Sequence, residues 1–372
     1  MRYVLFLPFL FLQLVSCSGS KYKDKGFDFN NKLNSLEEEK VVLPEKKTYF
    51  IDKAKEYGLD KVRAYNLNVV DLNGDDYSDI VVIPSFYSQP EFYYFNIAQK
   101  KFLKGRSPFK EAIKASYLLF YDLNKDKILD AITGVLNQKT EVSKEPFRIY
   151  YGKKDKENNL IFDEVKTDLK ASPNSSVGLI DYDLDGKLEF FISNWFGRHK
   201  GNPIPYRDQL LKQTDKGLED ISELLVGEMK QNPDKAMYIN AAPTYGVQVC
   251  DMDQNGYPDI LTSSTNHYPN KLWMNRYKFR EEFRFFENVG VKSGYASDTE
   301  GLLNTQGGGR TFGLACADYN NDGIMDVFIG ELTHNYDNEG VDKSSILTGR
   351  TLKSSPRSVS YTHLRAHETD SY

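Results

Sequence analysis

Carboxylate side chains are concentrated in a short motif that occurs five times along the chain. Each copy has the form Asp-x-[Asp/Asn]-x-[Asp/Asn]-(often Gly)-x-x-[Asp/Glu] and lies between two apolar runs. We call the copies loops 1 to 5 and number each from its first Asp. The residues at positions 1, 3, 5 and 9 are Asp71, Asn73, Asp75 and Asp79; Asp122, Asn124, Asp126 and Asp130; Asp181, Asp183, Asp185 and Glu189; Asp251, Asp253, Asn255 and Asp259; and Asp318, Asn320, Asp322 and Asp326.

This arrangement of oxygen ligands suits a hard cation. Calcium takes six to eight oxygens at about 2.3–2.6 Å, and positions 1, 3, 5 and 9 of a tight loop can converge on one point. A glycine at position 6, present as Gly186, Gly256 and Gly323, permits the sharp turn without a Cβ clash. Without a cation the crowded carboxylates would repel one another. The motif therefore predicts several structural Ca²⁺ ions.

Loops 1 and 2 depart from this pattern. Loop 1 has Asp76 where glycine is expected, and loop 2 has Lys125 and Lys127 beside its ligands. Loop 2 is thus the loop that we expect to bind calcium weakly or not at all.

The motif has two other possible interpretations. An EF-hand shares the start of the motif but needs a bidentate Glu at position 12 and a following helix. Position 12 is Val82, Thr133, Ile192, Thr262 and Ile329. None of these can chelate through a carboxylate, so an EF-hand is excluded. The other alternative, solvated acidic turns that hold no metal, remains open.

The segments around the loops indicate the elements that position them. They are rich in β-branched and aromatic residues, which favours strands. The motifs start 51, 59, 70 and 67 residues apart, a spacing that fits the blades of a propeller better than the repeats of a solenoid. The sequence therefore predicts an all-β fold with the acidic loops between strands.

The repeats resemble FG-GAP (or VCBS) repeats, the blades of integrin-α-like propellers. Residues 245–260 (YGVQVCDMDQNGYPDI) and 312–327 (FGLACADYNNDGIMDV) align with each other throughout, and Phe312-Gly313 is the "FG" of the name. Residues 307–334 are also similar to the ASPIC/UnbV and cartilage-acidic-protein group. The resemblance covers roughly residues 46–350. It implies a β-propeller with seven or eight blades in the full protein and calcium bound in its loops.

Residues that follow the second strand of a repeat are candidates for a ligand rim on the opposite face. They are Trp195, Arg198, His199, His267 and His334. Aromatic and His side chains there would suit a glycan or a peptide. The alternative is that these are ordinary turn residues.

Three classes of function remain open. The first is recognition or adhesion through an extracellular or periplasmic protein or glycan. The second is a carbohydrate-active enzyme (polysaccharide lyase or hydrolase) on the same scaffold, and the third is a structural or assembly component of an envelope complex. No known catalytic motif is found, so the chain is predicted not to be an enzyme. A net charge of −5 makes nucleic acid an unexpected partner.

The N-terminus has the pattern of an export signal. Arg2 precedes an apolar run from residue 4 to 15, and the segment ends Leu-Val-Ser-Cys, which resembles a bacterial lipobox. This resemblance implies a signal peptide over residues 1–16, a lipidated Cys17 and a flexible tether over residues 17–47. It places the protein in the bacterial cell envelope, at the outer membrane or cell surface or on the periplasmic side. The alternative is an ordinary signal peptide with a stray cysteine.

The sequence of the C-terminus predicts a different origin from the rest of the chain. Residues 359–369 (VSYTHLRAHET) resemble a translated adapter used in DNA library preparation, the alternative being a genuine polar tail. We therefore expect an incomplete propeller over residues 48–357, an artefact over residues 358–372, and no metal site at the His363–His367 pair.

The remaining two cysteines, Cys250 and Cys316, lie in apolar strand-like runs. Three cysteines in all do not indicate a disulfide framework. Both are predicted to be small, unpaired core residues.

Overall fold

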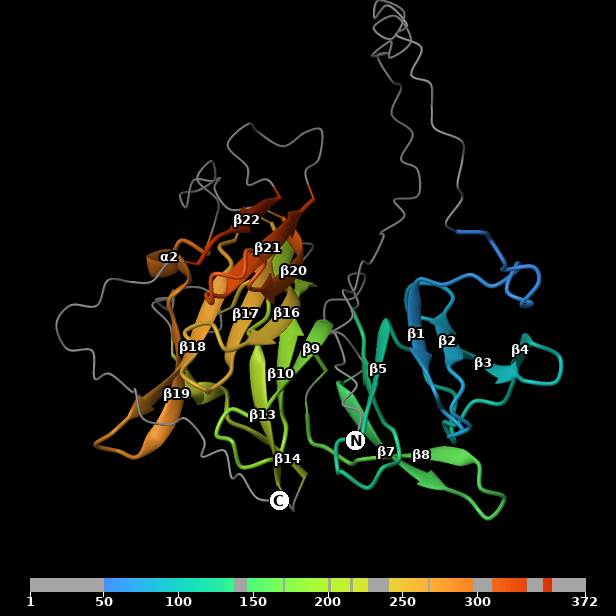
Figure 1. The fold of residues 1–372 in the computed structure, drawn as a ribbon. Coiled ribbons are helices and arrows are strands. Elements are labelled where there is room, and N and C mark those ends of the chain that lie inside the picture. The colour runs from blue at the N-terminus through green and yellow to red at the C-terminus, as the bar shows by residue number, and fades with distance from the viewer. Residues whose placement is uncertain are drawn as a thin grey trace, which may run out of the picture. The chain divides into compact units, whose positions relative to one another are not determined.

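The computed structural model describes residues 50–136, 146–169, 171–199, 202–214, 217–226, 241–266, 268–296, 310–332 and 344–349. These residues form small β-sheets, with only a 3₁₀ turn, η1 (Ser222–Leu224), and a four-residue helix, α2 (Gly290–Ser293). Within these ranges no helix has the length and apolar character needed to cross a bilayer. Two compact units are distinguished, one of residues up to 133 with 149–164 and one of residues 134–148 with 165 onward (Figure 1).

The first unit is built on two four-stranded meanders. The first sheet has the order β1 (Asn66–Val70), β2 (Asp79–Ile83), β3 (Glu91–Asn96), β4 (Lys101–Lys104). The second has the order β5 (Tyr117–Tyr121), β6 (Asp130–Gly134), β7 (Arg148–Lys154), β8 (Leu160–Glu164). Val81 and Phe92 of the first sheet share one buried cluster with Leu118 and Phe162 of the second. The two sheets therefore pack face to face, as neighbouring blades do.

The second unit holds three further sheets. The third sheet pairs β9 (Asn174–Ile180), β10 (Glu189–Asn194), β13 (Gln209–Thr214) and β14 (Gly217–Asp220), with a separate hairpin of β11 (Phe196–His199) and β12 (Asn202–Pro205). The fourth pairs β16 (Thr244–Cys250), β17 (Asp259–Ser264), β18 (Lys271–Lys278), β19 (Phe283–Asn288) and the short parallel strand β15 (Leu225–Val226). The fifth pairs β20 (Thr311–Ala317), β21 (Asp326–Glu331) and β22 (Ser345–Leu347).

The first strands of the three sheets in this unit pack against one another, because alternate residues of a strand point to opposite faces. On β16, Val247 and Val249 approach β9 so closely that a Cβ on Gly178 would lie 3.0 and 3.3 Å from their methyl groups. A Cβ on Gly246 would point the other way, 3.4 Å from the carbonyl oxygen of Phe312 on β20. The strand β16 thus contacts the first strand of the neighbouring blade on each of its two faces.

This construction is a β-propeller, and the predicted all-β propeller fold is confirmed. Five blades lie within the described residues, each with one acidic loop between its first and second strands. Seven or eight blades in the full protein remains a prediction. The proposed signal peptide, the lipidation site Cys17, the tether and the C-terminal segment 358–372 lie outside the described residues.

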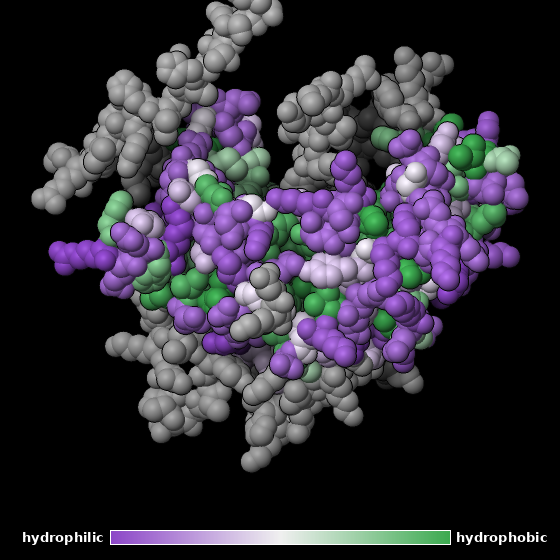
Figure 2. All heavy atoms as spheres, turned by 90° about the horizontal axis from the view of Figure 1, so that it is seen from below, coloured by the Kyte–Doolittle hydropathy of each residue, from purple (hydrophilic) through white to green (hydrophobic). Residues whose placement is uncertain are grey.

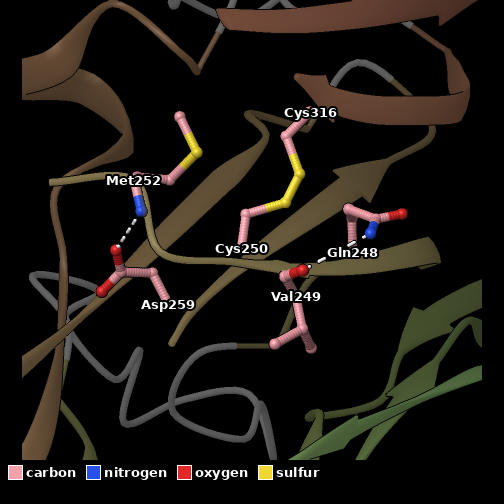
Figure 3. The surroundings of a disulfide bond; sticks show 6 residues. All are labelled: Gln248, Val249, Cys250, Met252, Asp259 and Cys316. Carbon is pink, nitrogen blue, oxygen red and sulfur yellow. Dashed lines mark hydrogen bonds between the residues drawn. A yellow bond between two sulfur atoms is a disulfide. The ribbon is translucent and has the colours of Figure 1, made fainter. Parts of the chain in front are cut away.

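The prediction for the two cysteines is wrong. Cys250 on β16 and Cys316 on β20 form a disulfide with a Cα–Cα distance of 6.7 Å (Figure 3). Cys250 lies one residue before loop 4, and Cys316 lies two residues before loop 5. Because that offset reverses the direction of the side chain, Cys250 points toward the next blade and Cys316 points back toward it. The two residues join neighbouring blades across their facing first strands.

Hydrophilic side chains dominate the face drawn in Figure 2, with separate small apolar patches between them. Scattered apolar residues of this kind are normal on a folded surface. The large apolar side chains are instead found in the clusters between blades, around Phe92 and Phe162 in one unit and around Trp273 and Phe286 in the other.

Candidate metal centres in the acidic loops

The carboxylate at position 1 organises each loop by accepting backbone hydrogen bonds. In loop 5 the N–H groups of Asp322 and Gly323 donate to Asp318 at 3.0 and 2.8 Å. In loop 4 the N–H groups of Asn255 and Gly256 donate to Asp251 at 3.0 and 2.8 Å. The same contacts recur at Asp71 and Asp122, and at Asp181 from position 6 alone. The sequence repeat is therefore a repeat of one turn geometry.

The backbone turns through left-handed conformations at two positions of every loop. Position 6 has φ between 66° and 87°, and position 4 has φ between 57° and 80°. The glycine preference predicted for position 6 follows from this. Loops 1 and 2 place Asp76 and Lys127 there at φ 66° and 70°, a conformation that costs a residue with a Cβ about 1–2 kcal/mol. The second left-handed position had not been predicted.

The carboxylate at position 9 has a structural role that the sequence did not reveal. It is buried at the start of the second strand of each blade. In three loops it joins the loop to the third strand, and in loop 5 it joins the loop to Gly349, two residues after the third strand. Asp259 accepts the N–H of Met252 at 2.8 Å and the N–H of Asn275 on β18 at 2.7 Å. Asp79, Asp130 and Asp326 accept the equivalent pair of N–H groups. Because burying a carboxylate is costly unless it is hydrogen-bonded, these bonds explain how the residue is tolerated there.

Burial makes several of these carboxyl groups easier to protonate. Desolvation raises the pKa of Asp259 to about 7, opposed by its two backbone hydrogen bonds and reinforced by the charges of Asp253 and Asp251. Desolvation also raises the pKa of Asp79 and Asp130. A bound cation would favour the charged form of the same groups.

Loops 3 and 4 bring three carboxylates close together. In loop 3 the oxygens of Asp181, Asp183 and Asp185 lie within 4.8 Å of one another, and in loop 4 those of Asp251, Asp253 and Asp259 do. Such a set of carboxylate oxygens is the donor type that calcium prefers. In loop 3 the buried Oδ1 of Asp181 has no hydrogen-bond partner.

Loops 1, 2 and 5 carry Asn at position 3, which reduces the negative charge. Its amide donates to the carboxylate at position 5, from Asn73 to Asp75 at 2.9 Å, from Asn124 to Asp126 at 3.0 Å and from Asn320 to Asp322 at 2.9 Å. The amide oxygen also accepts the N–H of position 5. The residues at positions 3 and 5 are close enough to bind one cation, but hydrogen bonds between them already occupy part of their polar atoms.

Basic side chains from the third strand contact two of the loops. In loop 3, Nζ of Lys212 on β13 lies 2.7 Å from Oδ2 of Asp183 and 3.4 Å from Oδ2 of Asp185. In loop 4, Nη1 of Arg276 on β18 donates to Oδ2 of Asp253 at 2.9 Å. Neither contact had been predicted, because the partners are distant in sequence.

The fit to calcium therefore differs between loops. Loop 4 offers three converging carboxylates, one contacted by Arg276, and loop 5 keeps Asp318 and Asp322 with a neutral Asn320. In loop 3 a side-chain ammonium already lies against the carboxylates. The twenty predicted ligands are positioned by one common turn, but position 9 acts first as a hydrogen-bond acceptor.

Of the predicted rim residues, Trp195 is the one whose side chain the structure describes. It is 8% exposed and packs against Phe196 and Tyr245, with ring centroids 4.5 and 5.5 Å away. Its indole N–H donates to Thr265 at 2.6 Å. Trp195 is thus a core residue of the second unit, and its ring is not presented to solvent. Arg198 and His199 lie on β11 with side chains outside the described part, and His267 and His334 are outside the described residues.

A buried ion pair connects the third and fourth blades. Nζ of Lys271 on β18 lies 3.6 Å from Oδ2 of Asp208, which precedes β13. The hydroxyl of Thr244 donates to the same oxygen at 2.9 Å, and the N–H of Asn194 donates to Oδ1 at 3.0 Å. Burial raises the pKa of Asp208 and lowers that of Lys271. The sequence does not indicate this pair, because Lys271 follows turn residues and resembles a surface lysine.

The FG-GAP-like repeat family matches residues 251–329, which span loops 4 and 5 and the strands between them. No curated protein sequence matches the chain. Among solved structures it is similar to the crystal structure of the V. cholerae biofilm matrix protein Bap1, at 13% identity and a TM-score of 0.37, over 72% of this chain and 35% of that one. The chain thus spans about a third of that protein's length. Blades of one construction accompany all five loops and the family match covers two of these loops, so the chain fits an FG-GAP repeat β-propeller protein.

Proposed function

We propose that this protein is a calcium-stabilised propeller of the bacterial cell envelope that recognises a glycan or a protein. The observation that carries the calcium assignment is the convergence of Asp251, Asp253 and Asp259 within 4.8 Å in loop 4. Calcium there would neutralise the carboxylates and hold the ends of two strands together. An ion that binds only the folded state stabilises it by mass action.

Recognition is favoured over catalysis by the way in which the loop carboxylates are used. Those at position 9 are buried and accept two backbone N–H groups in four of the loops, and those at position 1 accept N–H groups of their own turn. These groups hold the scaffold, which leaves binding to exposed surfaces. The lipobox-like N-terminus supports a lipid anchor at Cys17.

Exposed aromatic side chains of the β18–β19 hairpin support a sugar-binding surface. Tyr277, Phe279 and Phe283 are 41%, 81% and 37% exposed. The guanidinium of Arg284 lies over the ring of Tyr257, 3.0 Å from its centroid. Flat aromatic faces of this kind stack on sugar rings, and a neighbouring cation can contact acidic sugars.

Thermal unfolding in chelator, in excess magnesium and in millimolar calcium tests the metal assignment. We expect a calcium-specific rise in Tm that Asp251→Asn and Asp253→Asn each reduce. The matched control is Asp155→Asn, because Asp155 lies in an exposed turn outside the acidic loops. Equal Tm values in chelator and calcium would contradict calcium binding.

Binding to a glycan array by the calcium-loaded protein tests recognition. Phe279→Ala with Tyr277→Ala should abolish the signal while the Tm in calcium is kept. The control is Tyr121→Ala, which removes an exposed aromatic ring from β5 in the other unit. Binding that survives the hairpin substitutions would assign recognition to another surface.

A further inference from the structure

The third blade differs from the others at two positions that face each other. Loop 3 has Glu189 at position 9, where the other four loops have Asp. The register of β10 with β13 pairs Phe190 with Leu211, which places Lys212 opposite Glu189. By the same register, the residue opposite position 9 is Met274 in the fourth blade and Tyr94 in the first.

This pairing changes the hydrogen bonds of the loop. In four loops one oxygen of the position 9 Asp accepts an N–H from the third strand or, in loop 5, from Gly349 just after it. In loop 3 the buried Oε1 of Glu189 has no hydrogen-bond partner and lies 3.6 Å from Nζ of Lys212. The longer Glu and the lysine thus replace the backbone contact with an ion pair.

The ammonium of Lys212 lies among the carboxylates that would otherwise bind a metal ion. Its Nζ is 2.7 Å from Asp183, 3.4 Å from Asp185 and 3.6 Å from Glu189. The side chain is 25% exposed, and Nζ lies 5.3 Å from the centroid of the Tyr182 ring. An ammonium is a compact cation with three donors, so one group can serve three carboxylates.

We propose that Lys212 is the resident cation of loop 3 and takes the place of the metal ion in the third blade. A divalent ion at about 2.3–2.6 Å from the Asp183 and Asp185 oxygens would lie against Nζ, so it could enter only after displacing the ammonium. That displacement breaks three attractive contacts and sets two cations beside each other. The third blade therefore keeps its loop closed without calcium.

Arg276 on β18 contacts the carboxylates of loop 4 less extensively than Lys212 contacts those of loop 3. Its Nη1 contacts only Asp253 among the loop carboxylates, and its Nε lies 3.5 Å from Glu287 on the neighbouring strand β19. The side chain is 37% exposed. The guanidinium thus binds the loop from its edge and leaves Asp251 and Asp259 facing each other.

The first test is the number of calcium ions bound per folded chain, measured by equilibrium dialysis of wild type and Lys212→Met. We expect the variant to bind one ion more than wild type, and Asp183→Asn in the variant to remove that ion. Lys187→Met is the matched control, because it removes a positive charge from position 7 of the same loop and should leave the count unchanged. A wild-type count that falls by one on Asp183→Asn would overturn the proposal.

The second test is thermal unfolding in chelator, and it does not rest on the calcium binding proposed above. Lys212→Met leaves the carboxylates of loop 3 without a cation, so its Tm should fall by at least about 2 °C relative to Lys187→Met. Calcium should restore that loss. Equal Tm values for the two variants in chelator would overturn the role of Lys212, whatever the other loops bind. Calcium counts of zero in every variant, with the Tm loss retained, would instead contradict only the proposed calcium function.

Discussion

The residues at the left-handed positions 4 and 6 determine how much backbone strain each loop adds, and so how much it lowers the free energy of unfolding. Loop 5 meets the requirement at position 6 with Gly323 at φ 83°, whereas loop 2 meets it with Lys127 at φ 70°. The N–H of Lys127 donates to Asp122 at 2.9 Å, a bond that glycine would keep. The two loops therefore differ in strain at position 6 because Lys127 has a Cβ atom and Gly323 does not.

Lys127→Gly should stabilise the protein. Removing the Cβ from a left-handed position relieves strain, and the greater freedom of glycine in the unfolded chain offsets part of the gain, which leaves about 1 kcal/mol. Urea unfolding in chelator measures it. Gly323→Ala is the reciprocal change and should destabilise by a similar amount. A less stable Lys127→Gly variant would show that the lysine side chain contributes more than the strain costs.

The Asp259 carboxyl predicts how calcium stabilisation depends on pH. Its pKa rises from 3.8 in the unfolded chain to about 7 in the fold, so the folded state binds the proton more tightly. Through this group, stability in chelator should be highest below about pH 4 and fall as the pH rises to about 7. Bound calcium would hold the carboxylate charged and should cancel that loss. The rise in Tm on adding calcium should therefore be larger at pH 8 than at pH 5.

Asp259→Asn is the control for this pH dependence, because the amide does not titrate in that range. The variant should show a flatter dependence of Tm on pH in chelator than wild type does. A calcium effect that is equal at pH 5 and pH 8 in wild type would contradict the assignment of this carboxylate to the site.

At the scale of the element, the position 9 carboxylate fastens each loop to its sheet. Asp130 in loop 2 is fully buried and accepts the N–H groups of Leu123 and Gly152 at 2.7 and 2.8 Å. Loop 2 is also a loop that the sequence predicts to bind calcium weakly or not at all, because Lys125 and Lys127 lie beside its ligands. In loop 2 the hydrogen-bonding role of the position 9 carboxylate can therefore be measured separately from any role in binding calcium.

Asp130→Ala should cost much more stability than Asp126→Ala in the same loop. The first change leaves two buried N–H groups without an acceptor, at about 1–3 kcal/mol for each group. The second removes an exposed carboxylate whose partners can turn to water, so its cost should stay below about 1 kcal/mol. Urea unfolding in chelator compares the two. Equal losses would show that position 9 is no more structural than position 5.

The sequence was sufficient for the elements but not for every contact of the loops. The repeat and its flanking β-branched residues predicted the strands and the acidic turns, because both depend on local spacing. The roles of Asp130 and Lys212 depend on contacts with the third strand of the blade, between residues at least 22 positions apart, and no local pattern specifies the register of that strand. The burial of Trp195 likewise depends on Tyr245 in the next blade.

At the scale of the whole molecule, the blades within each unit pack against one another, and the disulfide makes one such contact covalent. Cys250 and Cys316 lie 66 residues apart and join the first strands of the fourth and fifth blades (Figure 3). A cross-link of this length removes conformational entropy from the unfolded chain worth about 4 kcal/mol. Disulfides persist in oxidising compartments, so a disulfide between blades is compatible with the proposed location in the cell envelope.

Cys316→Ser should therefore lower the Tm of the calcium-loaded protein by several degrees, since about 1 kcal/mol corresponds to 2–4 °C in a domain of this size. Cys250→Ser should lower it by a similar amount, and the double variant should lose no more than either single one, because each removes the same bond. Reductant should bring the wild-type Tm down toward that of the variants and leave theirs unchanged. Two outcomes would contradict the disulfide: a wild-type Tm that reductant does not change, or Tm losses that add up in the double variant. Either result would show that the two cysteines act separately as core residues, as the sequence alone predicts.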